Sequence, residues 1–70
     1  MNSLQKIGEK IKDRRKVLNI GQETLADFSG VGITTISNLE NGKGNITIET
    51  LDSLFEILGL ELSINIKQMI

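Results

Sequence analysis

Apolar residues recur at helical spacing in four stretches of the chain, and glycines or capping residues mark their limits. The first predicted helix runs from a cap at residue 2 or 3 to about residue 18, and the second covers residues 22–29. The third starts near residue 33 and stops at Gly42, and the fourth runs from a cap at Thr47 to Gly59. The positions expected to face the core are Leu4, Ile7, Ile11, Leu18, Leu25, Phe28, Ile36, Leu39, Leu51, Leu54, Phe55 and Leu58.

The apolar spacing changes after Gly59. In "LELSINIK", residues 60–67, apolar and polar residues alternate, and this period of two predicts a half-buried β-strand. No other segment offers a second strand, so the ladder partner must come from another molecule. We therefore divide the chain into a helical domain, residues 1–59, and a C-terminal dimerisation strand and tail, residues 60–70. The side chains expected at the dimer interface are Leu62, Ile64 and Ile66.

Length and composition exclude several ways of stabilising the fold. A chain of 70 residues forms one small domain and buries only roughly 60% of its unfolded surface. It contains no Cys and no His, so disulfides, thiolate sites and imidazole metal ligands are excluded, and a partner chain is the option left open. Apolar runs are too short for a membrane span or a secretory signal, which makes a cytoplasmic protein the default expectation.

Charge is distributed unevenly although the net charge is only −1. Residues 44–66 carry acidic groups and no basic ones. The basic residues of the first twenty positions are Lys6, Lys10, Lys12, Arg14, Arg15 and Lys16. These residues either solvate the outer face of the first helix or allow this end of the molecule to face phosphate.

The second and third predicted helices are joined by "SGVG", residues 29–32, which is typical of a helix-turn-helix. Ala26 is small where the two helices would cross, and Gly30 can adopt the positive φ of a tight turn. The third helix itself, "ITTISNLE", is rich in Thr, Ser and Asn, which are indifferent helix formers. Such a helix is either a poor connector or one whose exposed polar face contacts another molecule.

The stretch "GQETLADFSGVGITTISNLENGKGNITIETLDSLFEILGL" resembles the helix-turn-helix domain of the Cro and phage-repressor (XRE-type) family, over about residues 5–60. The resemblance implies an all-α, compact four-helix, lambda-repressor-like DNA-binding domain. Its third helix would be the recognition helix, which enters the major groove of double-stranded DNA. The small polar face is then a base-reading surface. It also implies a transcriptional regulator, most simply a repressor, that acts as a homodimer on a palindromic operator.

Site residues follow from the resemblance position by position. The expected base-reading residues are Gly32, Ile33, Thr34, Ser37 and Asn38. The expected phosphate contacts are Gln22, Thr35, Asn41, Lys43 and Arg15. Arg15 and Glu40 are also expected to form an ion pair that ties the first helix to the end of the third. The chain departs from the family at Gly21 and Gly32, where Ser or Thr caps are common. Glycine at such a cap costs a few tenths of a kcal/mol.

Other classes of function receive less support from the sequence. An enzyme is not expected, because the chain lacks His, Cys and a suitably spaced carboxylate pair, and no cofactor is expected. RNA or single-strand binding would favour stacking aromatics, whereas the only aromatic residues are Phe28 and Phe55. The C-terminal strand resembles that of short antitoxin repressors of the HipB kind. An antitoxin or adaptor that binds a toxin or another partner protein therefore stays open as the alternative.

Overall fold

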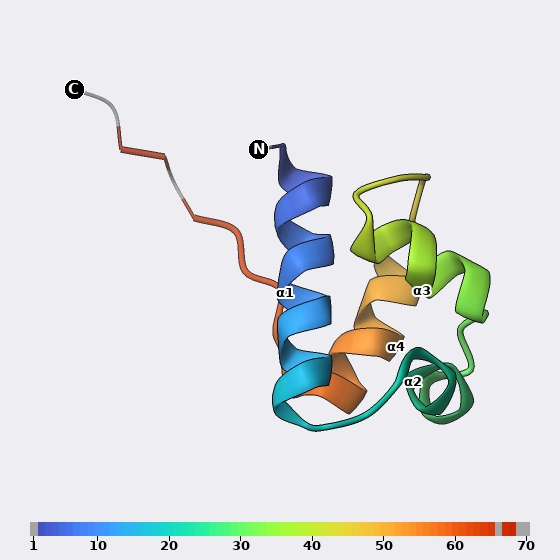
Figure 1. Cartoon of the computed structure of the whole chain (residues 1–70). Helices are drawn as coiled ribbons and strands as arrows, with labels where there is room; N and C mark the ends of the chain where they lie inside the picture. Colours follow the sequence, from blue (N-terminus) through green and yellow to red (C-terminus); the bar gives the residue numbers. More distant parts are fainter. Residues whose placement is uncertain (1, 66, 69–70) are drawn as a thin grey trace.

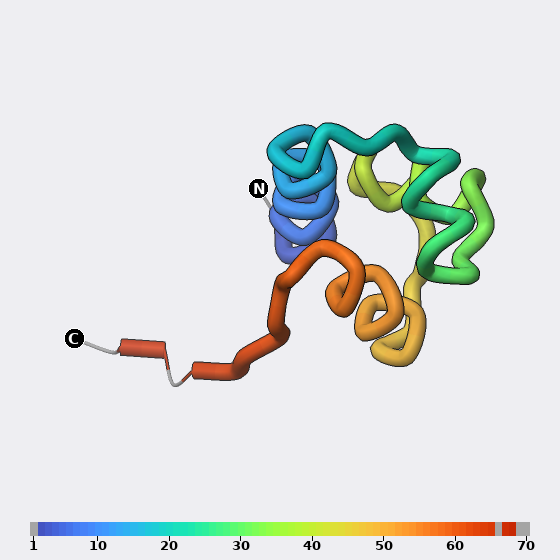
Figure 2. The backbone as a smooth tube through the Cα atoms, turned by 90° about the horizontal axis from the view of Figure 1, so that it is seen from below, coloured from blue at the N-terminus to red at the C-terminus, as the bar shows by residue number. Residues whose placement is uncertain are grey.

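The computed structural model describes residues 2–65, 67 and 68, and four helices lie in this part of the chain (Figure 1). They are α1 (Ser3–Val17), α2 (Gln22–Ser29), α3 (Ile33–Glu40) and α4 (Ile48–Leu58). Seen from below, they surround a common centre (Figure 2), in which α1 and α2 each pack against both α3 and α4. The predicted all-α helix-turn-helix fold is confirmed. None of the helices in the described part combines the length and apolar character needed to span a bilayer.

Local sequence signals set the ends of the helices. Asn2 begins α1 with a capping box, in which its side chain accepts from the amide of Gln5 and its own amide donates to the Gln5 side chain, each at 2.9 Å. Thr47 caps α4 in a similar way, by accepting from the amide of Thr50 at 3.1 Å. Gly59 has a left-handed conformation and ends α4, as predicted.

The end of α3 is the left-handed glycine cap that was predicted. The last helical residue is Glu40, Asn41 follows as the cap residue, and Gly42 has φ +71°. The amide of Gly42 donates to the carbonyl of Leu39 at 3.0 Å, and that of Lys43 to the carbonyl of Asn38 at 2.8 Å. These two bonds form a Schellman motif, which satisfies the last carbonyls of the helix.

The core is built from apolar residues of all four helices. Its buried members are Ile11, Leu25, Ile36, Leu39, Leu51, Leu54, Phe55 and Leu58. All eight were predicted to face the core. Full burial of one such side chain stabilises the fold by about 1.5–3 kcal/mol, so these contacts dominate the stability of so small a domain.

Two predicted core positions are wrong. Phe28 is 65% exposed, because the buried face of α2 follows Gln22, Leu25, Ala26 and Ser29 and leaves residue 28 on the outer side. Leu18 is exposed as well, because α1 ends at Val17 and the chain turns away there. Helical spacing marks a stripe of apolar residues, but it does not say how much of that stripe the neighbouring helices cover.

The turn between α2 and α3 follows the predicted helix-turn-helix pattern. Gly30 has φ +74°, a left-handed conformation that glycine adopts without strain. The amide of Val31 then donates to the hydroxyl of Ser29 at 3.1 Å, and the Val31 side chain packs against the core. Three residues thus redirect the chain so that α3 begins with its N-terminus exposed.

The close contact between α1 and α3 was not predicted from the sequence. Gly8 is buried in the middle of α1, and a Cβ atom placed there would lie 2.0 Å from the carbonyl oxygen of Leu39. The two helices therefore approach each other at backbone distance. A glycine inside a helix costs about 0.5–1 kcal/mol relative to alanine, and its presence in the apolar stripe of α1 was the available signal.

Residues 60–65 form no strand in the single chain, in contrast to the sequence prediction. The segment leaves the helical body on the side of α1 and stays extended (Figures 1 and 2). Leu62 is 44% exposed and Ile64 is 95% exposed, whereas Ile66 lies outside the described residues. A strand needs a neighbour to satisfy its backbone groups, so the predicted pairing depends on a second chain and stays a prediction.

Candidate nucleic-acid interface

Helix α3 has one apolar face and one polar face. Ile36 and Leu39 are buried in the core. The opposite face carries the residues predicted to read bases: Gly32, Ile33, Thr34 and Asn38 are exposed and Ser37 is half-buried. Ile33 presents an apolar side chain, 42% exposed, beside these polar groups. The exposed face thus offers hydroxyl, amide and methyl groups within two turns of helix, the chemistry with which proteins contact base edges.

The predicted phosphate contacts surround this face. Thr35, Asn41 and Lys43 are exposed, and Gln22 is half-buried at the first position of α2. The side chain of Asn41 donates to the carbonyl of Ser37 at 3.0 Å, so its amide is already bound to its own helix. Lys43 lies in the Schellman turn, one residue after Gly42. These side chains come from both ends of α3 and from the start of α2.

Arg15 and Glu40 form a bidentate ion pair between α1 and α3. Arg15 Nε lies 2.8 Å from Glu40 Oε2, and Arg15 Nη2 lies 2.8 Å from Glu40 Oε1. Arg15 Nη1 also donates to the carbonyl of Ile20 at 3.1 Å. The side chains are 13% and 3% exposed, respectively, so water screens the pair weakly. The pair ties the C-terminus of α3 to the last turn of α1 and to the turn that follows it.

The environment of this pair shifts both pKa values toward the charged forms. Burial alone would raise the pKa of Glu40, but hydrogen bonds from Arg15 and Gln22 and the charges of Arg15 and Lys12 lower it below its ordinary value. For Arg15 the hydrogen bond to Glu40 raises the pKa and outweighs the opposing effect of burial. Both groups are therefore ionised at neutral pH. The ordinary pKa of the glutamate, 4.5, marks the pH below which its contribution to stability declines.

Three N–H groups of Arg15 are thus bonded within the protein. Its predicted second role as a phosphate contact would depend on the two remaining donors of the guanidinium, and it stays a prediction.

The neighbouring arginine has a role that sequence reasoning missed. Arg14 Nε donates to the carbonyl of Leu58 at 3.0 Å and so satisfies an otherwise free carbonyl at the C-terminus of α4. The consecutive arginines therefore point to two different helices, Arg15 to α3 and Arg14 to α4. The separation of 44 residues between Arg14 and Leu58 leaves no local signal for this contact.

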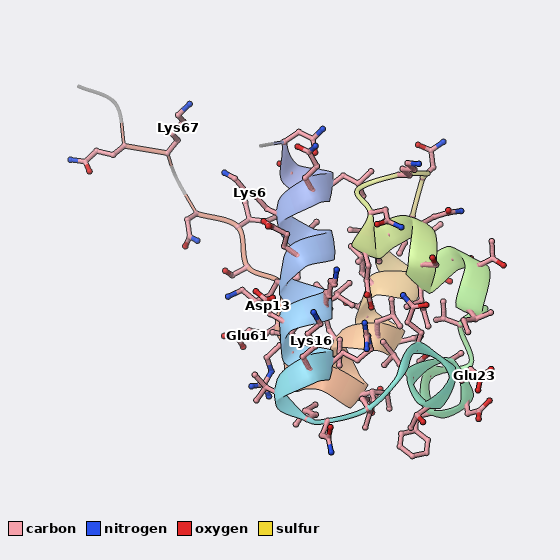
Figure 3. All side chains as sticks on the ribbon, viewed as in Figure 1. Lys6, Asp13, Lys16, Glu23, Glu61 and Lys67 are labelled. Carbon is pink, nitrogen blue, oxygen red and sulfur yellow. The ribbon has the colours of Figure 1, made fainter. Side chains whose placement is uncertain are left out.

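Charges are spread over the rest of the surface. Lys6 lies on the side of α1 nearest to the C-terminal segment, whereas Glu23 lies on α2 at the far end of the molecule (Figure 3). Lys12 and Lys16 of α1 line an open pocket together with Glu40, Asn41 and Gly42, so two cations lie beside the C-terminal end of α3.

Comparison with known proteins places this arrangement in a family. The helix-turn-helix family model matches residues 11–65, more than half of the chain. The chain belongs to the helix-turn-helix proteins of the Cro and phage-repressor type, a class of DNA-binding domains. The predicted resemblance is confirmed.

Three known proteins are similar in sequence to this chain. The chain is 32% identical over 60 residues to the ImmF control region 10 kDa protein of Bacillus phage phi105, covering 86% of this chain and 67% of that protein. It is 35% identical over 60 residues to the cryptic phage CTXphi transcriptional repressor RstR of Vibrio cholerae serotype O1, covering 86% and 52%. It is 35% identical over 52 residues to the control protein C.SmaI of Serratia marcescens, covering 74% and 62%. The chain thus spans between about half and two thirds of these relatives.

Proposed function

We propose that this protein is a transcriptional repressor that binds a palindromic operator in double-stranded DNA as a homodimer. The observation that carries the proposal is the two-faced α3, whose apolar side is buried while its N-terminal polar side is exposed beside a helix-turn-helix turn. The relative named as a transcriptional repressor supports the direction of regulation. The repressor would act by occlusion, because a dimer on the operator blocks polymerase.

In this proposal the N-terminal half of α3 enters the major groove. Thr34 and Ser37 exchange hydrogen bonds with base edges, Asn38 pairs with adenine and Ile33 packs on thymine methyl groups. Gly32 has no side chain and lets the backbone approach the DNA. Gln22, Thr35, Asn41 and Lys43 fix the position of the domain through phosphates.

The dimer is proposed from the C-terminal segment. An open groove of about 240 Å³ lies between this segment and the helical body, and its apolar lining comes from Ile7, Phe55, Leu60 and Leu62. Antiparallel pairing of two copies would satisfy the edge backbone groups and cover Leu62 and Ile64. A twofold axis would also present two recognition helices to half-sites about one helical turn apart.

The location of the protein and any further partner belong to the same proposal. Such a regulator acts where the DNA is, in the cytoplasm. The exposed apolar side chains of the C-terminal segment also favour a second candidate, an antitoxin or adaptor in which this segment binds a toxin or another protein. In the homodimeric repressor a second copy of the chain would cover Ile64, whereas in the antitoxin or adaptor another protein would cover it.

Selection from a random pool of duplexes tests the proposal. The full chain should enrich sequences that contain an inverted repeat, with half-site centres about 10 base pairs apart. Enrichment of single half-sites would contradict the homodimer. Absence of any enrichment, together with no binding of duplex DNA at low salt, would contradict DNA binding itself.

A further inference from the structure

The carboxylate of Glu40 joins side chains from three helices. Its Oε2 accepts from Arg15 Nε, and its Oε1 accepts from Arg15 Nη2 at 2.8 Å and from Gln22 Nε2 at 3.3 Å. Arg15 belongs to the last turn of α1, and Gln22 is the first residue of α2. The last residue of the recognition helix is thus bonded to the residue that is expected to hold a phosphate at the start of another helix.

This contact determines the orientation of the Gln22 amide. An ionised carboxylate only accepts hydrogen bonds, so the amide must turn its nitrogen toward Glu40 and its oxygen away. The amide nitrogen carries two hydrogens, and one of them is used by Glu40. The second N–H has no acceptor among the described residues and is available to a ligand.

The carboxylate itself is held firmly. Arg15 binds both of its oxygens and is anchored in turn to the carbonyl of Ile20. Glu40 has only 3% of its side chain exposed, so it has little freedom to move away from Gln22. A rigid acceptor of this kind orders a flexible amide before any ligand arrives, and that reduces the entropy lost on binding.

We propose that Glu40 is a positioning residue for DNA binding, which aims the free N–H of Gln22 at a DNA phosphate without touching the DNA itself. The inference rests on the proposed function, since Gln22 must meet a phosphate. Its consequence is specific: removing the Arg15–Glu40 pair weakens DNA binding through Gln22, and a phosphate contact of Arg15 itself would show as a loss that persists in the Gln22→Ala background. Lys43, which lies beyond the end of α3 and has no bond to Glu40, should be independent of the pair.

The decisive variant replaces both partners of the ion pair, Arg15→Met together with Glu40→Met. Replacement of a buried pair by apolar residues of similar size is often neutral for stability, whereas it removes the acceptor for Gln22. Circular dichroism should show a folded chain with a melting temperature near that of the wild type. If this variant does not fold, Glu40→Gln takes its place, because it keeps the shape and removes the negative charge, which weakens the acceptor for the Gln22 amide.

Binding to a short random-sequence duplex is measured by fluorescence anisotropy at low salt and over a series of NaCl concentrations. Gln22→Ala should weaken binding about tenfold, the loss expected for one charge-assisted hydrogen bond, and leave the salt slope unchanged, because a neutral amide displaces no counterion. The pair variant should weaken binding to a similar degree. When the pair variant is combined with Gln22→Ala, the affinity for the duplex should fall no further. When it is combined with Lys43→Ala, the two fold-losses of affinity should multiply.

Two results would overturn the inference while leaving DNA binding intact. One is a pair variant that binds the duplex as tightly as the wild type. The other is a loss that multiplies with Gln22→Ala as fully as with Lys43→Ala, which would mean that the pair acts only through the fold. A wild-type chain that fails to bind any duplex would instead overturn the proposed function, and this inference with it.

Discussion

The two ends of α3 are built in opposite ways. The C-terminal end is fixed by the Schellman turn, by the Arg15–Glu40 pair and by the close approach of α1 at Gly8. The N-terminal end begins at Gly32, which offers no side-chain cap, and Ile33 and Thr34, which follow it, are exposed. We therefore expect substitutions at the held end to change stability, apart from the effect on DNA binding proposed above for Gln22, and those on the exposed polar face to change DNA binding.

The largest expected effect is at the held end. Glu40→Ala leaves the Arg15 guanidinium weakly solvated and unpaired, and breaking a buried pair from one side typically costs about 3–5 kcal/mol. Urea unfolding of the variant should show this loss, which approaches the whole stability of a small domain. The exposed Glu56→Ala in α4 is the matched control, expected within about 0.5 kcal/mol of the wild type. A midpoint for Glu40→Ala equal to that of the control would show that the pair contributes nothing.

The second-largest expected effect is at the contact between α1 and α3. Gly8→Ala forces a methyl group against the carbonyl of Leu39, and backbone cannot move aside as a side chain can. We expect a loss of about 2–3 kcal/mol, at the upper end for overpacking, despite the better helix propensity of alanine. Gly21→Ser serves as the control, because a Cβ there meets nothing within 4 Å and Ser is a better cap. A melting temperature of Gly8→Ala above that of the wild type would contradict the close approach of α1 to α3.

The third-largest expected effect is on dimerisation, through the C-terminal segment. Ile64→Lys places a charge at the proposed interface and should weaken dimerisation about tenfold to a hundredfold, without unfolding a domain in which this residue is 95% exposed. Asn65→Lys, on the opposite face of the predicted strand, should leave the dimer unchanged. Sedimentation equilibrium of the two variants beside the wild type measures this. A wild-type chain that is monomeric at micromolar concentration would exclude strand pairing and favour the partner-protein alternative.

On the exposed polar face of α3, Asn38→Ala should change DNA binding and little else, because the substitution leaves the backbone carbonyl of the Schellman turn in place. We expect a loss of about 1–3 kcal/mol on the selected operator and a relaxed preference at one base pair. Lys43→Ala should weaken binding to all duplexes alike and lower the salt slope by about one unit. Anisotropy titrations on operator and scrambled duplexes separate the two. If Asn38→Ala lowers the melting temperature and spares operator preference, the side chain of Asn38 is structural and the proposed orientation is wrong.

The smallest expected effect is the pH dependence of the stability that Glu40 contributes at the held end of α3. The pKa of Glu40 is lowered in the folded chain, so its contribution is fully present above the ordinary value of 4.5 and is lost as pH falls through the folded value. Urea unfolding between neutral pH and pH 2 should show this loss. Glu40→Gln should be less stable at neutral pH and should decline less steeply below pH 4.5. Parallel curves for the two proteins would mean that other carboxylates carry the acid sensitivity.

Much of the fold was predictable because its signals are local. The caps at Asn2 and Thr47, the left-handed Gly30 and Gly59, and the bounds of α2 all depend on residues within a few positions of one another. The eight buried core residues followed from helical spacing. The exposure of α3's polar residues was likewise expected from their chemistry.

The errors and omissions concern contacts with other helices or with other molecules, which local signals in the sequence do not specify. Phe28 was placed in the core because periodicity defines the face of a helix and not the area that its neighbours cover. The site residues expected to read bases came from a resemblance, and their contacts with DNA stay predictions. The C-terminal alternation indicates a strand, but in a single chain its backbone groups have no ladder partner.

The sequence by itself determined where the helices begin and end and which residues are available for the core, since capping, glycine conformation and spacing act within a few residues. Only the tertiary structure decided that Gly8 lets α1 touch α3, that Arg14 binds the carbonyl of Leu58, and that Gln22 shares the carboxylate of Glu40 with Arg15. These contacts join residues far apart in the chain. Their existence depends on the crossing geometry of whole helices, which collective packing sets to within fractions of an ångström.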